Sequence, residues 1–209
     1  IGMTAFSGFG AVLHPLLHGR TDVETNANTI HRLAPQELEL IVAASIAHQA
    51  SDPKDRPFGT AIIDVGASQG IAQLRPGEVE AWAPSHAGGS RQDSKVAIAA
   101  MVGKLEYANN AISAAQAVTG RSISKTDQYM LLALAQNCSQ EAQIEKTVNT
   151  FFASEGRWDQ AFDTDYAVSW DWKEQLRLIV LHIDWLLLNG WTLPEGVEIW
   201  NMREKAFED

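Results

Sequence analysis

Apolar residues recur at steps of three and four along most of the chain, the spacing of helices that bury one face. The clearest run predicts a helix over about residues 93–118, ended by Gly120. Its expected inward face is Val96, Ala100, Met101, Leu105, Ala108, Ile112 and Ala115. Similar patterns predict helices over about 35–48, 78–82, 124–137, 141–153 and 168–189. The pattern therefore indicates a mainly α protein, built as a helical bundle.

A different pattern occupies the region between the first and second thirds of the chain. Thr60 to Val65 is the best strand candidate, so we expect a small β element near residues 60–66. Residues 1–34 are expected to be an N-terminal extension with at most a short helix over Ala11–His18, and residues 35–209 a single domain. The tail after Gly190 reads as irregular. Most of the tryptophans of the last third are expected in the core: Trp158, Trp170, Trp172, Trp185, Trp191 and Trp200.

Composition narrows the possible partners. The 209 residues carry a formal net charge of −10, which argues against nucleic acid as a main partner because phosphate binding needs a basic surface. No apolar stretch is long enough to predict a membrane span. Cys138 is the only cysteine, so an intrachain disulfide is impossible. Compartment and oligomeric state stay open.

Common catalytic signatures are missing. The sequence has no glycine-rich phosphate loop, nucleophile elbow or zinc-protease motif. His14 and His18 have the spacing of a helical metal pair, but no third ligand stands out, so neither a metal nor a cofactor is predicted.

One stretch is typical of a cleft. A helix is expected to end near Gln49, a loop rich in Asp, Pro and Gly follows, and the compact phrase Gly70-Ile71-Ala72-Gln73-Leu74 closes the segment. This order resembles the lysozyme-like superfamily, particularly goose-type lysozymes and soluble lytic transglycosylases, in which a helix ends in the catalytic Glu and a Gly-x-x-Gln turn lines the cleft. A weaker second match is Ala135-Gln136-Asn137, which stands where those families carry Ala-Tyr-Asn.

The resemblance implies a lysozyme-like fold and a β-1,4-linked N-acetylhexosamine polymer as substrate, with peptidoglycan favoured over a chitin-like chain. It assigns position 49 to the general acid, and Asp64 to the base that activates water in an inverting hydrolysis, across about 6.5–9.5 Å. Ser68, Gln73 and Asn137 would hydrogen-bond the sugar, and Trp82 and Tyr129 are candidate stacking surfaces. A secreted or cell-wall location would follow.

Gln49 departs from the family, because an amide cannot give a proton to a glycosidic oxygen. Three explanations compete. The chain is an acid-knockout form of an active enzyme, or a natural protein that binds glycan without cutting it, or the acid is another residue: Asp52, Asp55, Glu78 or Glu80.

Further alternatives stay open at this point. The family includes transglycosylases, which lack the base and let the sugar's own 6-hydroxyl attack. A silent glycan-binding or structural domain on the same fold, or an unrelated helical interaction protein, also fits the sequence.

Overall fold

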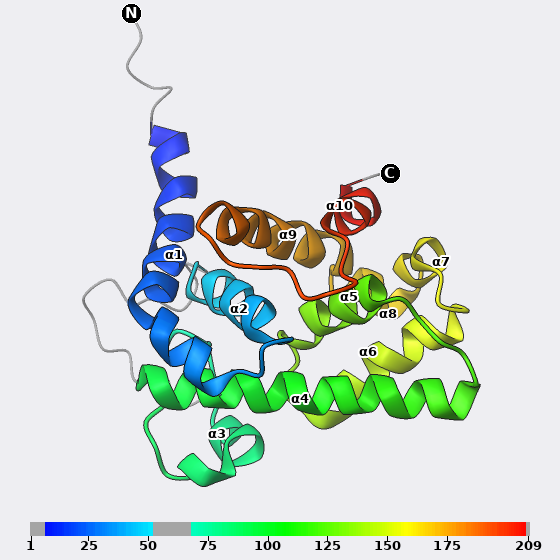
Figure 1. The fold of residues 1–209 in the computed structure, drawn as a ribbon, viewed down its shortest axis with the longest axis horizontal. Helices are drawn as coiled ribbons and strands as arrows, with labels where there is room; N and C mark the ends of the chain where they lie inside the picture. The colour runs from blue at the N-terminus through cyan, green and yellow to red at the C-terminus, as the bar shows by residue number, and fades with distance from the viewer. Residues whose placement is uncertain (1–6, 52–67, 208–209) are drawn as a thin grey trace, which may run out of the picture.

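The computed structural model of the chain describes residues 7–51 and 68–207, with side chains for residues 19–50 and 68–207. Ten α-helices and one 3-10 turn follow one another in these ranges (Figure 1): α1 (Ser7–Leu33), α2 (Glu39–Ser51), α3 (Glu78–Trp82), η2 (Pro84–His86), α4 (Ser94–Thr119), α5 (Lys125–Ala135), α6 (Glu141–Ala153), α7 (Trp158–Phe162), α8 (Asp165–Ser169), α9 (Trp172–Leu188) and α10 (Ile199–Phe207). The described part contains no β-strand, only an isolated bridge between Gln69 and Leu74. The mainly α prediction is confirmed, whereas the β element predicted near residues 60–66 lies outside the described residues.

Helix α2 is the centre of the bundle. It packs against α1, α4, α5 and α9 (Figure 1), and every residue from Leu40 to Ala47 is at most 1% exposed. The apolar spacing predicts one buried face, and that face is buried. The other sides of the helix are buried as well, because neighbouring helices surround it and its alanines face them. The next partly exposed residues are His48 and Gln49. The C-terminal end of α2 therefore carries polar side chains at the edge of the core.

Helix α4 matches its sequence pattern closely. All seven residues of the predicted inward face are buried. The carboxylate of Asp93 accepts the N–H groups of Lys95 and Val96 at the start, and Gly120 ends the helix with a φ of 64°. Gly103 lets α3 approach, since a Cβ there would lie 1.8 Å from the carbonyl oxygen of Trp82.

The two ends of the chain differ from the predictions. Helix α1 is one 27-residue helix rather than a short one. Val23 and Ile30, seven residues apart, lie in the core, and α1 packs on α2 and α4. This packing stabilises a helix that the polar sequence of the segment does not predict. The tail predicted as irregular contains α10, and its Trp200 is 74% exposed instead of buried.

The helix predicted over 168–189 is two helices. Asp171 takes a left-handed φ of 50° between α8 and α9, a conformation that Asp tolerates better than most residues. The break turns α8 away and lets Trp172 pack in the core at 2% exposure. Trp158 is also buried, and Trp170, Trp185 and Trp191 pack partly buried against the core.

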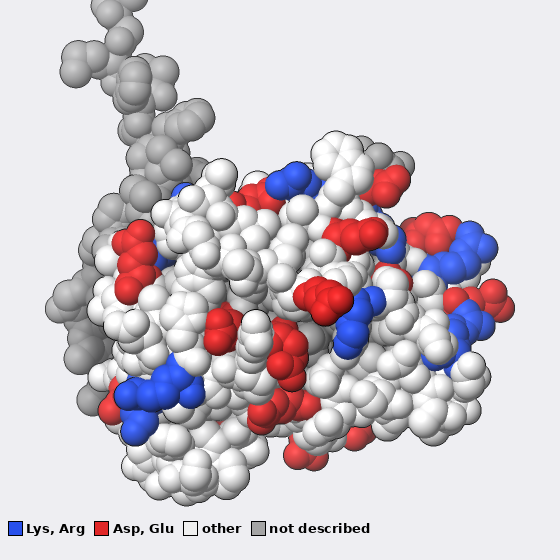
Figure 2. Space-filling view, in the orientation of Figure 1, with Lys and Arg blue, Asp and Glu red and all other residues white. Residues whose placement is uncertain are grey.

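The visible surface offers no strongly basic region. On the face shown in Figure 2, Lys and Arg side chains are scattered among Asp and Glu without forming a continuous patch. None of the helices in the described ranges combines the length and the apolar character that crossing a bilayer would require.

Candidate functional site

Gln49 lies at the C-terminal end of α2, where it contacts the end of α5. Its Nε2 donates to Oε1 of Gln136 over 2.6 Å and to Oδ1 of Asn137 over 2.5 Å. The partners are 87 and 88 residues away in the chain. The structure thus brings together the proposed acid position and the second sequence motif.

The far side of this contact is the segment that ends α5. Gln136 caps the helix through its backbone N–H, and Asn137 and Cys138 continue the turn with bonds back to the carbonyls of Leu134 and Ala135. The Gln136 side chain is 1% exposed, and its Nε2 is buried with no hydrogen-bond partner. Sequence reasoning missed Gln136, because the family's pattern places a tyrosine there.

The Gly70–Leu74 turn is closed tightly by its own backbone and by Gln73. Gln69 and Leu74 exchange two backbone bonds of 2.9 Å, and Nε2 of Gln73 donates to the carbonyl of Gly70 over 2.8 Å. Gly70 has a φ of 74°, and a Cβ there would lie 2.0 Å from the carbonyl oxygen of Arg91. Only glycine fits this position. Oε1 of Gln73 is buried without a partner.

A buried ion pair lies beside the turn. Nζ of Lys104 donates to Oε1 of Glu78 over 2.7 Å, and the two residues are 3% and 4% exposed. Glu78 does not suit the acid role, because one carboxylate oxygen is paired with Lys104 and the other accepts the N–H of Arg75. Glu80 is exposed on α3, and Asp52 and Asp55 lie outside the described residues.

The remaining predicted site residues divide into three groups. Ser68 is half-buried at the start of the second described range. Trp82 and Tyr129 are only 5% and 3% exposed, so neither ring offers an open face to a sugar. Asp64, the proposed base, lies outside the described residues, as do the side chains of His14 and His18.

Next to Gln49, a second polar group is buried in the bundle. The ring of His48 lies 6.1 Å from that of His182 on α9, and His182 is 1% exposed with no partner for either nitrogen. Burial, with the nearby His48 and Arg20, lowers the pKa of His182 to about 3. This imidazole is neutral at pH 7 and belongs to the core rather than to the site.

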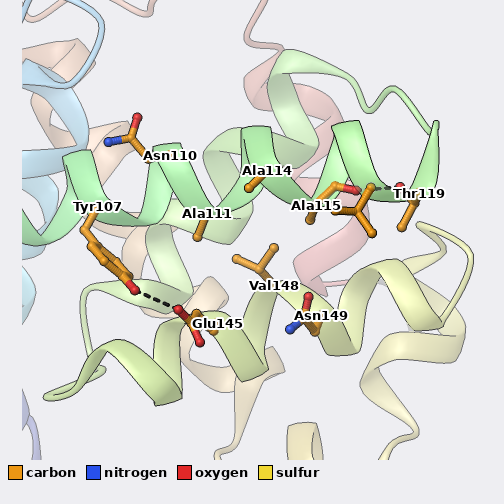
Figure 3. Close-up of a pocket in the computed structure, with 10 residues that line it drawn as sticks. Tyr107, Asn110, Ala111, Ala114, Ala115, Thr119, Glu145, Val148 and Asn149 are labelled. Carbon is orange, nitrogen blue, oxygen red and sulfur yellow. Dashed lines mark hydrogen bonds between the residues drawn. The ribbon is translucent and has the colours of Figure 1, made fainter.

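Two of the hollows on the described surface border α6, and one of them touches the site. One, of about 490 Å³, lies between the end of the Gly70–Leu74 turn and the start of α6 and is lined in part by Arg75, Trp82 and Ser139. The other, of about 410 Å³, is an apolar groove between α4 and α6, where Tyr107 bonds Glu145 at one end and Ala111, Ala115 and Val148 form the floor (Figure 3). It contains none of the predicted site residues.

The described residues around Gln49 form no cation site. Within the described ranges, no group of three or more His, Cys, Asp or Glu side chains is placed to hold a metal ion. The polar groups at Gln49, Gln73, Gln136 and Asn137 are amides, which can donate and accept hydrogen bonds but cannot transfer protons at neutral pH. These four amides can bind a polar ligand, and none of them can act as a general acid.

Comparisons of the chain with protein-family models, with curated proteins and with solved structures found no significant match.

Proposed function

We propose that the chain carries a lysozyme-like glycan site, with position 49 in the place of the general acid. The substrate is a β-1,4-linked N-acetylhexosamine polymer, and peptidoglycan is favoured over chitin. The observation that carries the proposal is the contact of Gln49 with Gln136 and Asn137, because it joins the acid-helix motif to the second wall motif across more than 80 residues of chain. A chance resemblance of two short phrases gives no reason for their side chains to meet.

The residue at position 49 determines whether the site only binds glycan or also cleaves it. An amide cannot protonate the leaving oxygen, so the chain with Gln49 binds glycan and leaves it intact. A glutamate has nearly the same shape. Its carboxyl group would receive N–H donors from Gln136 and Asn137 once their amides rotate, and Gln136 already has an unused Nε2.

In the active form, the carboxyl at position 49 protonates the glycosidic oxygen while Asp64 activates water on the opposite face of the sugar. The two-carboxylate arrangement is that of an inverting glycosidase. If Asp64 plays no part, the sugar's own 6-hydroxyl attacks, and the product is an anhydro sugar. Product analysis separates the two outcomes.

The test is a gain of function. Gln49→Glu should clear the turbidity of a purified cell-wall suspension, while the parent and Gln49→Ala should not. The parent should still sediment with the insoluble walls. A well-folded Gln49→Glu protein that neither clears nor sediments with cell walls or chitin would overturn the proposal.

A second candidate is a silent glycan-binding or structural domain. The observation in its favour is that Nε2 of Gln49 already has two good acceptors, so the amide is well accommodated as it stands. This candidate predicts cell-wall binding by the parent with no clearing by Gln49→Glu. Binding of neither glycan by either protein would instead favour a helical interaction protein.

A further inference from the structure

The buried pair Lys104–Glu78 connects the two walls of the candidate site. Glu78 opens α3 and Lys104 lies in the middle of α4, 26 residues later. Both side chains are almost fully enclosed, and their charged atoms lie 2.7 Å apart. Neither residue hydrogen-bonds the Gln49 side chain, whose partners are Gln136 and Asn137, so the pair acts on position 49 through the segments beside it.

Each charge also holds one backbone group. Oε2 of Glu78 accepts the N–H of Arg75 over 2.6 Å, directly after the Gly70–Leu74 turn. Nζ of Lys104 donates to the carbonyl of Gln136 over 3.4 Å, directly before Asn137. A continuous series of polar contacts therefore runs from the turn through Glu78, Lys104 and Gln136 to Gln49.

Stability alone gives a poor reason for such a pair. Removing two charges from water offsets most of their mutual attraction, and apolar residues of similar volume often serve a fold as well or better. An apolar pair could not, however, accept the Arg75 N–H or donate to the Gln136 carbonyl. The ion pair forms directional hydrogen bonds to both loop segments and so fixes their positions relative to each other.

We infer that Lys104 and Glu78 are positioning residues, which hold the Gly70–Leu74 turn against the Gln136–Asn137 segment and so set the geometry around position 49. The effect on glycan cleavage rests on the proposed function. The effect on the Gln49 and Asn137 side chains does not, and the two can be measured separately.

The decisive variant is Lys104→Met with Glu78→Met, which removes both charges and keeps the volume. Its thermal midpoint should stay within about 5 °C of the parent's, since no unpaired charge is left buried. The side-chain amide resonances of Gln49 and Asn137 should nevertheless shift. In a Gln49→Glu background the cell-wall clearing rate should fall about 100-fold, the order expected when a reacting group is misplaced by about 1 Å.

A matched control removes another ion pair, Arg203–Asp184 between α9 and α10, in the same way. It should leave the amide resonances and the clearing rate unchanged. If the Lys104/Glu78 double variant does not fold, Glu78→Gln keeps the side-chain shape and should move the same two resonances.

Unchanged Gln49 and Asn137 resonances in a folded variant would overturn the inference. An inert Gln49→Glu protein that also fails to bind glycan would refute the proposed function alone, because the resonances still report whether the pair positions the amides.

Discussion

Nε2 of Gln49 donates to Oδ1 of Asn137 over 2.5 Å and so joins the end of α2 to the end of α5. The two residues come from the two sequence phrases that resemble the lysozyme-like families. Their hydrogen bond is the structural observation behind the proposed function, and its free energy can be measured.

A double-mutant cycle with Gln49→Ala and Asn137→Ala should give a coupling free energy of about 0.5–1.5 kcal/mol, the usual net contribution of one hydrogen bond. The measurement is urea unfolding of the parent, both single variants and the double variant. Additive effects, within about 0.3 kcal/mol, would show that the two side chains do not interact in solution.

Gly70→Ala should strongly destabilise the turn that carries Gln73. Alanine would pay a penalty of about 1–2 kcal/mol for the positive φ, and its Cβ would also collide with the carbonyl oxygen of Arg91. Gly77→Ala is the matched control, because Gly77 has a φ of 84° but no atom within 4 Å of the added Cβ. Thermal unfolding should show the larger loss at Gly70. Equal losses would mean that the turn does not lie against Arg91.

Acid should destabilise the bundle through His182. Its pKa is lowered from the ordinary value to about 3 in the folded state, first by burial and then by His48 and Arg20. Below pH 6.5 the unfolded chain therefore binds the proton that the folded chain refuses, and stability is lost as the pH falls towards 3. Between pH 7 and pH 5 this single group should cost about 2 kcal/mol.

The check is urea unfolding at pH 7 and pH 5, for the parent and for His182→Leu and His182→Phe. Either substitution should remove about 2 kcal/mol of the pH dependence, whatever it does to stability at pH 7. The same slope in the His182 variants as in the parent would contradict the assignment.

Asp127 should be a stability centre for the C-terminal half. Its carboxylate accepts bonds from Ser124, from Nε1 of Trp158 and from Nζ of Lys205, and so connects α5 to α7 and α10. Although burial opposes it, these bonds hold the pKa of Asp127 below its usual range. Asp127→Ala should cost about 2–3 kcal/mol, because it leaves a charged and an indole donor without their acceptor.

The control is Asp159→Ala, which removes a carboxylate from an exposed pair with Arg157. Chemical unfolding should not distinguish it from the parent, since solvent screens such pairs. A comparable loss in both variants would mean that the Asp127 contacts add nothing beyond a surface charge.

The elements that the sequence predicted well are those whose information is local. The inward face of α4 and the Gly120 stop both follow from residues within the helix or beside it. The failures depended on contacts distant in the chain. Helix α1 is stabilised by packing on α2 and α4. The break at Asp171 is a left-handed backbone conformation that an Asp within an apolar helical pattern does not by itself predict.

The candidate site divides in the same way. The order of the two sequence motifs predicted Gln49 and Asn137 as site residues. Nothing in the local sequence indicated that the Gln136 side chain would also hydrogen-bond Gln49. The sequence could have indicated the role of Lys104, because this residue lies between Met101 and Ala108 on the buried stripe of α4. A buried lysine needs an ion-pair or hydrogen-bond partner. Trp82 is buried rather than a stacking surface, and the close approach of its backbone to Gly103, 21 residues later, is a contact that no local pattern indicates.

The most direct test of the glycan site is a nuclear magnetic resonance titration of the parent protein with a soluble peptidoglycan fragment and, separately, with a chitin oligomer. The account predicts that one of the two shifts the side-chain amide resonances of Gln49, Gln73 and Asn137 in a saturable manner, while the amides of Gln128 and Asn109, which bond each other on α5 and α4, stay unmoved. Saturating fragments that leave Gln49 and Asn137 unshifted would contradict it.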